Sequence, residues 1–262
     1  MTPPPPVPPV QIPGAWPWPD FKFWQVASTT STMDDARLQR AAGCRRGGVL
    51  ADAQSAGRGR LPGRRWQAEP GASLLCTLWL PRAEFQAAPP SLLVGAAVRL
   101  ALEQCLTGEL GRLEIKWPND LLVDGRKLAG LLCEAAGDTV FCGLGLNIEP
   151  VTVGAAAAAA FRRPPTSLRQ AFGQAPERGR LLAALADSLA ALCGGRLDWL
   201  EVVQAHLAWR GQTVEFRPGL GNGPAVRGRL DGVAVDGSLV LTTDAGWYCA
   251  LSGELTLVGG LE

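Results

Sequence analysis

Histidine, lysine and paired cysteine are scarce in this chain, and each scarcity excludes a class of site. His206 is the only histidine among 262 residues, so metal sites that need two imidazoles and Ser-His-Asp or Cys-His nucleophile relays are excluded. The seven cysteines are odd in number and include no C-x-x-C pair, which argues against a disulfide framework or a structural zinc site. We therefore expect reduced, mostly buried thiols in a cytoplasmic protein, with a structural role for His206.

Long apolar runs and net charge are also missing. No apolar run reaches the ~18 residues of a membrane span, so no membrane association is expected. Residues 1–20 hold nine prolines without a basic or apolar segment, which is unlike a secretory signal. Twenty-five basic and 24 acidic residues give a net charge of +1, so no global field attracts nucleic acid or an anionic membrane. Any site for a polyanion must be local.

The remaining composition is that of a folded enzyme, with 47% hydrophobic and 19% charged residues. We expect a proline-rich extended leader over 1–20 and an α+β domain over 21–210, where helical and strand patterns alternate. Short strand-like runs separated by Gly, Pro, Asn and Asp follow over 211–262, the size of a small SH3-like β-barrel. Residues 154–165, rich in alanine, are expected to form a surface excursion without chemistry.

Local patterns place the elements of the two domains. Ser31 and Thr32 are expected to cap a helix through Arg37, and Ser91 to cap another. Asp124-Gly125 is a hairpin signal. Helices are expected over 92–106, 178–192 and 197–209. Strands are expected over 49–53, 73–80, 113–117, 121–123, 127–134, 139–146, 212–217, 225–235, 238–243, 246–251 and 254–258.

The segment from Gln54 to Trp66 is rich in arginine and glycine and contains no carboxylate, so we expect an irregular loop of charge +4. Guanidinium groups suit phosphate and carboxylate oxygens, glycines let the backbone approach a ligand, and Trp66 offers a face for a base. The loop predicts a site for a nucleotide and an acid. A solvated basic loop and a nucleic-acid-binding segment are the alternatives.

Two strand ends carry further polar groups. Only three of the basic residues are lysines, and two of them, Lys116 and Lys127, flank the Lys-Trp-Pro-Asn-Asp segment over 116–120. Retention of lysine in an arginine-rich chain indicates positions that need a compact ammonium. Gly143, Gly145 and Asn147 end another strand, where the glycines leave room beside the backbone and the amide can bond phosphate, ribose or a metal-bound water.

The order of these motifs resembles the catalytic domain of the biotin protein ligases, through S-T-M-D-D-A, A-D-A-Q-S-A-G-R-G-R, the following Trp, K-W-P-N-D, R-K-L-A-G-L-L-C-E and G-L-G-L-N-I. The match runs from about Ser31 to Ile148, and the last segment, with G-E-L-T-L, is similar to the C-terminal domain of that family. The resemblance implies a mixed-sheet class II synthetase-like fold, biotin, ATP with Mg²⁺, and a biotin carboxyl carrier protein whose lysine is modified.

The resemblance also assigns residues. It implies a biotin site formed by Ser31, Thr32, Met33, Gln54, Gly57, Arg58, Gly59, Arg60, Lys116, Gly143 and Gly145, in which Lys116 contacts the biotin carboxylate. It implies an ATP site formed by Arg60, Trp66, Asn119, Lys127 and Asn147, with Mg²⁺ near Asn147. Leu61-Pro62 lengthens the arginine loop by about one residue relative to many relatives, which leaves the roles of Arg64 and Arg65 open.

The implied reaction is a two-step acyl transfer. Arg58, Arg60, Lys116 and Lys127 would bring the biotin carboxylate and the ATP phosphates together, giving biotinyl-5′-AMP, and Asp120 would act as base or orienting group for the carrier lysine. We expect no DNA binding, because no helix-turn-helix segment accompanies the motifs, and we expect a homodimer. A lipoate-ligase-like acyl-adenylate transferase and a non-catalytic nucleic-acid-binding module remain the alternatives.

Overall fold

The computed structural model describes residues 10–12, 14–151, 164–219 and 223–259, so most of the expected alanine-rich excursion and the first nine residues of the leader lie outside it. The helices are α1 (Thr32–Ala41), the 3₁₀ helix η1 (Arg82–Phe85), α2 (Pro90–Cys105), α4 (Leu168–Phe172), α5 (Arg178–Cys193) and α6 (Trp199–Ala205). Within the described ranges, no helix is long and apolar enough to cross a membrane.

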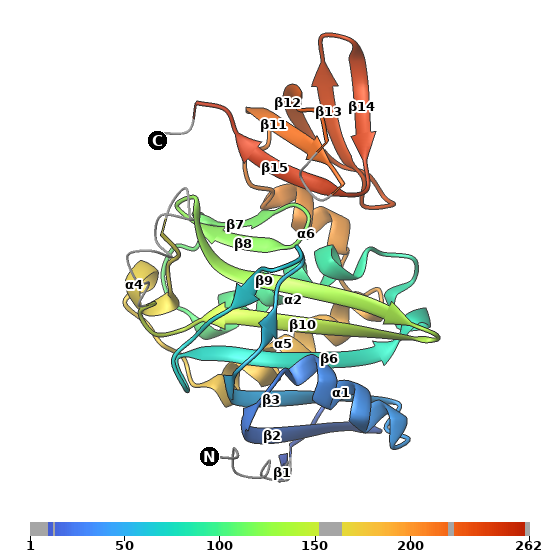
Figure 1. The fold of residues 1–262 in the computed structure, drawn as a ribbon, viewed down its shortest axis with the longest axis vertical. Coiled ribbons are helices and arrows are strands. Elements are labelled where there is room, and N and C mark those ends of the chain that lie inside the picture. The colour runs from blue at the N-terminus through green and yellow to red at the C-terminus, as the bar shows by residue number, and fades with distance from the viewer. Residues whose placement is uncertain (1–9, 13, 152–163, 220–222, 260–262) are drawn as a thin grey trace.

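The larger part of the chain is built on one mixed sheet, drawn in the middle and lower part of Figure 1. In the described residues it has eight strands, in which β2 and β3 run parallel and the other neighbours run antiparallel. Their spatial order is β1 (Val10–Ile12), β2 (Phe21–Thr29), β3 (Arg46–Gln54), β6 (Ser73–Pro81), β10 (Thr139–Asn147), β9 (Arg126–Ala136), β8 (Asp120–Val123) and β7 (Leu113–Lys116).

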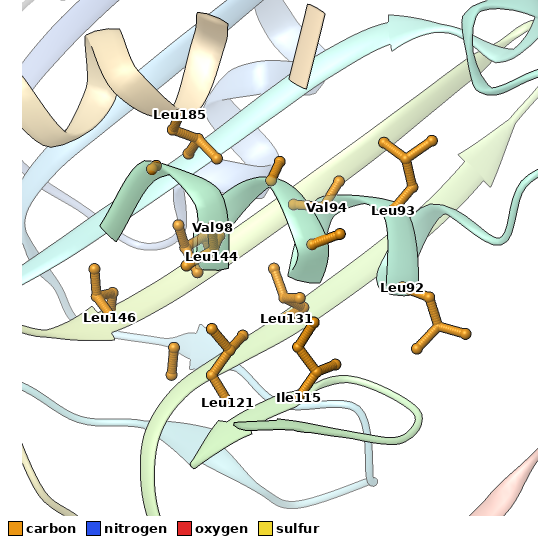
Figure 2. Packing of buried hydrophobic residues seen from close by; sticks show 14 of the residues in the cluster. Leu92, Leu93, Val94, Val98, Ile115, Leu121, Leu131, Leu144, Leu146 and Leu185 are labelled. Atoms are coloured by element: carbon orange, nitrogen blue, oxygen red, sulfur yellow. The ribbon is translucent and has the colours of Figure 1, made fainter. Parts of the chain in front are cut away.

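Helix α2 packs on one face of this sheet, and α5 covers α2 from outside. Figure 2 shows Val94 and Val98 of α2 between Leu131 and Leu144 of the sheet and Leu185 of α5. Helix α2 is apolar on most of its surface because it contacts apolar residues on both sides, as expected for a buried helix. The core therefore lies on this face of the sheet, in three layers.

The opposite face of the sheet carries helix α1 and a smaller apolar cluster, which includes Met33 and Trp79. Ser31 is the N-cap of α1 and accepts a hydrogen bond from the Met33 backbone N–H at 3.3 Å, as its sequence pattern predicts. Side chains alternate between the faces of a strand, so Leu144 and Leu146 of β10 point toward α2 while Gly143 and Gly145 lie on the face of α1. That glycine-lined face remains open beside α1.

A second sheet, entirely antiparallel, follows α6 and stands above the first in Figure 1. Its strands in spatial order are β14 (Gly246–Ala250), β13 (Leu239–Thr243), β12 (Val226–Val233), β11 (Thr213–Pro218) and β15 (Gly253–Leu257). Trp117, at the end of β7, joins the two sheets: its indole N–H donates to the Gly237 carbonyl at 3.0 Å, and its ring centroid lies 6.0 Å from that of Phe216.

The α+β class with one large mixed sheet is confirmed, and most expected strands lie within two residues of their observed bounds. Asp124 and Gly125 both have positive φ and join β8 to β9 in a two-residue hairpin, as predicted. The leader contributes a short edge strand, β1, against β2, and its end is packed by Trp16, whose ring lies 5.2 Å from that of Phe23.

One strand was not predicted, and three local expectations were wrong. Phe21–Thr29 is a long strand that the sequence reading did not assign. The helix expected to be capped by Ser91 begins at Pro90 instead, because a proline at the first helical position needs no N–H partner. The helix expected over 197–209 spans only Trp199–Ala205. The arginine loop is not wholly irregular, because β4 (Gly57–Arg58) and β5 (Arg65–Trp66) pair antiparallel.

Candidate active site

A pocket lies on the α1 side of the large sheet, where glycines place no side chains over the strand backbone. Its lining comes from α1, the arginine loop and strands β6, β9 and β10, and it consists of Ser31, Thr32, Met33, Gln54, Arg58, Gly59, Arg60, Trp66, Cys76, Thr77, Asn119, Lys127, Gly130, Leu131, Leu132, Gly143, Leu144 and Gly145. Segments that are far apart in the sequence therefore meet at one site, and most of the sequence-predicted residues are among them.

The polar end of the pocket is a connected hydrogen-bond network. Gln54 Oε1 accepts from the Thr32 backbone N–H at 2.8 Å and from the Thr32 hydroxyl at 3.1 Å. The Thr32 and Thr77 hydroxyl oxygens lie 2.9 Å apart, and both residues are buried. Hydroxyl and amide groups fixed in this way can recognise a small head group that has both N–H donors and a carbonyl acceptor.

Three glycines keep the sheet wall of the pocket open. A Cβ atom on Gly145 would lie 2.4 Å from the Trp66 ring, and one on Gly130 would lie 3.1 Å from the same ring. A Cβ on Gly143 would lie 3.2 Å from Met33 Cε. The Trp66 indole therefore lies flat against strand backbone, and its buried N–H makes no hydrogen bond to any described residue, which leaves a donor for a ligand.

The arginine loop closes the other side of the pocket, and two carboxylates hold its arginines. Arg58 pairs with Asp34 of α1 at 2.5 Å. Arg60 pairs with Glu254 of β15 and donates to the Gly253 carbonyl at 3.1 Å. Burial lowers the pKa of Arg60, and the negative charge of Asp120 acts in the opposite direction. Arg60 thus stays a cation at the mouth of the pocket.

The other predicted loop residues lie outside the lining. Gly57 supports the hairpin, since a Cβ there would lie 2.9 Å from the Trp66 carbonyl oxygen. Arg64 and Arg65 are exposed, and Gly59 N–H donates to the Arg64 carbonyl at 2.9 Å. Leu61 and Pro62 lie in the turn between β4 and β5, outside the pocket lining.

The two predicted lysines lie in different places in the structure. Lys127 lines the pocket, with its Nζ 2.6 Å from Asp120 Oδ1 and 5.8 Å from the centre of the Trp66 ring. Lys116 does not line the pocket, and its Nζ lies 5.4 Å from the Trp209 ring. The reason is strand order: Lys116 is on β7 at the sheet edge, two strands beyond β9. Lys127 therefore lies at the pocket, whereas Lys116 lies at the sheet edge.

The predicted asparagines occupy two neighbouring places. Asn119 lines the pocket and donates to the Leu131 carbonyl at 2.7 Å. Asn147 lies instead in an adjoining cavity of about 230 Å³, lined by Gln67, Ala68, Glu69, Ala72, Ser73, Asn147, Glu149, Pro150 and Val151. Its amide donates to the Thr166 carbonyl at 2.9 Å. The two cavities meet at the Trp66-Gln67 segment: Trp66 lines the pocket, and Gln67 lines the adjoining cavity.

Several lining residues were missed in the sequence, namely Cys76, Thr77, Gly130, Leu131, Leu132 and Leu144. Thr77 is the one polar residue inside the apolar run Leu74–Leu80, which was an available signal. Burial raises the pKa of Cys76 to about 12, so its thiol stays protonated at neutral pH and is not a nucleophile. Burial also lowers the pKa of His206, which lies at the end of α6 and outside the pocket lining.

Comparison with known proteins places this geometry in a family. A model of the biotin/lipoate A/B protein ligase family matches residues 23–147. The biotin–[acetyl-CoA-carboxylase] ligase of Paracoccus denitrificans is 34% identical over 226 residues, which cover 80% of this chain and 90% of that protein.

Solved structures agree with the fold. The biotin protein ligase of Aquifex aeolicus in complex with biotin and ATP superposes with a TM-score of 0.74 at 24% identity, covering 90% of this chain and 98% of that chain. The biotin protein ligase of Leishmania major in complex with biotin gives a TM-score of 0.60 at 26% identity, covering 90% of this chain and 99% of that chain. On its motifs, its pocket and these comparisons, the chain belongs to the biotin protein ligase family.

Proposed function

We propose that this chain activates biotin with ATP as biotinyl-5′-AMP and transfers the biotinyl group to a lysine of a biotin carboxyl carrier protein. The observation that carries the proposal is the composition of one pocket. Its closed end offers the Thr32, Gln54 and Thr77 network to a ureido group, and its open end offers three cations, Arg58, Arg60 and Lys127, to a carboxylate and a phosphate.

In the first step a biotin carboxylate oxygen attacks the α-phosphorus of ATP, the new P–O bond forms, and pyrophosphate leaves. Both reactants are anions, so they approach only where positive charge is already in place. Lys127, oriented by its ion pair with Asp120, would face the carboxylate, and Arg58 and Arg60 would face the phosphates. Preorganised charge of this kind is usually the largest single contribution to catalysis.

The two cavities beside Trp66 would bind different parts of the nucleotide. The Trp66 ring would stack on the base, and Asn147 lies in the adjoining cavity with Ser73 and Glu69. The described residues include no group of three or more His, Cys, Asp or Glu side chains arranged to hold a metal. Asn147 and Glu69, which line the adjoining cavity, would help to hold magnesium with the ATP phosphates, and the ion would neutralise phosphate charge.

In the second step the amine of the carrier lysine attacks the carbonyl of the mixed anhydride and AMP leaves. The amine must lose a proton, and Asp120 is the carboxylate next to Lys127 that would accept it or orient the amine. The arginine hairpin would exclude water from the anhydride until the carrier arrives. We also propose that the C-terminal sheet belongs to the SH3-like barrels, and that the protein is a cytoplasmic homodimer that does not bind DNA.

Biotin-dependent exchange of radiolabelled pyrophosphate into ATP tests the proposal directly. We expect exchange with biotin and none with lipoate, because the narrow polar end suits a ureido ring better than a dithiolane. Exchange that depends on lipoate instead would favour the lipoate ligases, which the matching family model also includes. No exchange with either acid, together with a steep salt-dependent affinity for oligonucleotides, would refute both enzyme assignments.

A further inference from the structure

One side chain of the pocket is held by the other sheet. Arg60 lines the pocket, yet its guanidinium pairs with the Glu254 carboxylate and donates to the Gly253 carbonyl at 3.1 Å. Gly253 and Glu254 are the first two residues of β15, which is an edge strand paired with β11. The arginine loop and the C-terminal sheet therefore meet at the mouth of the proposed active site.

The start of β15 is fixed in place by close packing. A Cβ atom on Gly253 would lie 2.2 Å from the Phe216 ring and 2.5 Å from the Arg217 carbonyl oxygen, so glycine is needed for β15 to lie against β11. The same Phe216 contacts Trp117, which is anchored to the second sheet through Gly237. Contacts from Trp117 through Phe216 to Gly253 thus hold the backbone at the start of β15, where Glu254 lies.

The Arg60–Glu254 ion pair is less exposed to water than the Arg58–Asp34 pair. The Arg60 side chain is 21% exposed and the Glu254 side chain 34% exposed, whereas the Arg58 and Asp34 side chains are 44% and 48% exposed. A charge-assisted hydrogen bond that is partly screened from water orients its donor more firmly than an exposed one. A glycine-rich loop loses much conformational freedom on ordering, so an anchor outside the loop lowers the cost of placing Arg60.

We propose that Glu254 is a positioning residue for adenylation: it holds Arg60 at the pocket, so that the C-terminal sheet completes the active site. The inference rests on the proposed function. It assigns a positioning role in adenylation to Glu254, which does not itself line the pocket. It predicts that loss of the Glu254 charge weakens the binding of the nucleotide and the retention of biotinyl-5′-AMP without unfolding the protein.

The test compares Glu254→Gln with the parent enzyme in biotin-dependent pyrophosphate exchange and in the rate of biotinyl-5′-AMP release. We expect the KM for ATP and the release rate to rise about three- to tenfold, with kcat changed less than about twofold. Glu254→Asp should recover part of the loss. Glu215→Gln is the matched control, because Glu215 pairs with Arg217 inside the same sheet, and it should behave as the parent.

A double-mutant cycle separates positioning from a general effect on the fold. In an Arg60→Ala background, Glu254→Gln should change the KM for ATP by less than about twofold, because its partner is gone. An equal effect of Glu254→Gln in both backgrounds, or a parent-like KM in the single variant, would overturn the inference alone. A parent that shows no biotin-dependent exchange would overturn the proposed function and the inference together.

Discussion

The two walls of the pocket are built on opposite principles. The sheet wall consists of long strands, β6, β9 and β10, that hydrogen-bond along their length and line the pocket with Gly130, Gly143 and Gly145. The loop wall has two strands of two residues each, and its arginines are held by carboxylates of other elements. The sheet wall thus contributes backbone and glycines to the pocket, and the loop contributes the two arginines Arg58 and Arg60.

Removal of the cation from the sheet wall should have the largest effect. Lys127→Ala should lower kcat/KM for adenylation by on the order of a hundred- to a thousandfold, because the ammonium stabilises charge where the carboxylate meets the phosphate. Lys116→Ala is the matched control and should lower it by less than about fivefold, since Lys116 lies over Trp209 at the sheet edge. Steady-state rates of pyrophosphate exchange measure both effects, and the reverse ranking would favour Lys116 as the residue that contacts the biotin carboxylate.

Trp66 belongs to the loop but lies on the sheet wall, so its truncation shows how far the two depend on each other. Trp66→Ala should weaken ATP binding by about ten- to a hundredfold, in keeping with ~1–3 kcal/mol for a base stacked on an aromatic ring. Biotin binding should change much less. Titration calorimetry with each ligand measures both affinities, and equal losses for biotin and ATP would show that Trp66 shapes the whole pocket.

An added methyl group probes the stiffness of the sheet wall. Gly145→Ala places a Cβ 2.4 Å from the Trp66 ring, so the ring and the hairpin must move, and we expect the KM for ATP to rise about five- to tenfold. Gly143→Ala places a Cβ 3.2 Å from Met33 Cε, the end of a flexible side chain, and should raise the KM for ATP less than about twofold. Comparable increases of the KM for ATP in the two variants would contradict this explanation, in which the Met33 side chain yields to an added methyl group and the Trp66 ring does not.

The exposed anchor of the loop should have the smallest effect. Asp34→Asn removes the partner of Arg58, and since both side chains are nearly half exposed we expect the KM for biotin to rise at most about threefold. The difference from the parent should shrink at high ionic strength, because salt screens an exposed pair. A tenfold rise that persists in salt would show that Asp34 acts on the ligand more directly.

Much of this site could be predicted from residue types within short segments. The rest depends on contacts between residues far apart in the sequence, which could not be predicted. Glycine, arginine and tryptophan in one segment indicated a loop for an acid and a nucleotide, and the structure brings Arg58, Arg60 and Trp66 to one pocket. The carboxylates that hold those arginines were not predictable, since Glu254 lies on another sheet far along the chain. No periodicity relates positions that meet only when two sheets pack.

The two lysines and the strand Phe21–Thr29 are further features that the sequence alone could not place. Lys116 and Lys127 both lie at strand ends, and only the strand order, with a register shift between β8 and β9 at Leu121/Leu122, decides which one reaches the pocket. The strand Phe21–Thr29 is buried at Phe21, Phe23, Trp24 and Val26, so its alternation is broken where two neighbouring aromatic residues are both buried. A reading based on strict alternation overlooks such a strand.

The short strand β1 has a consequence for how copies of the chain meet. In the described residues it pairs with β2 over three positions, and in the sequence it is bracketed by Pro9 and Pro13, which have no backbone N–H to offer. A long strand with a free edge invites another chain to extend the sheet, whereas a three-residue edge between prolines gives such a chain little to bind. Among the described residues, the outer edge of β1 is therefore a poor place for a second copy of the chain to extend the sheet.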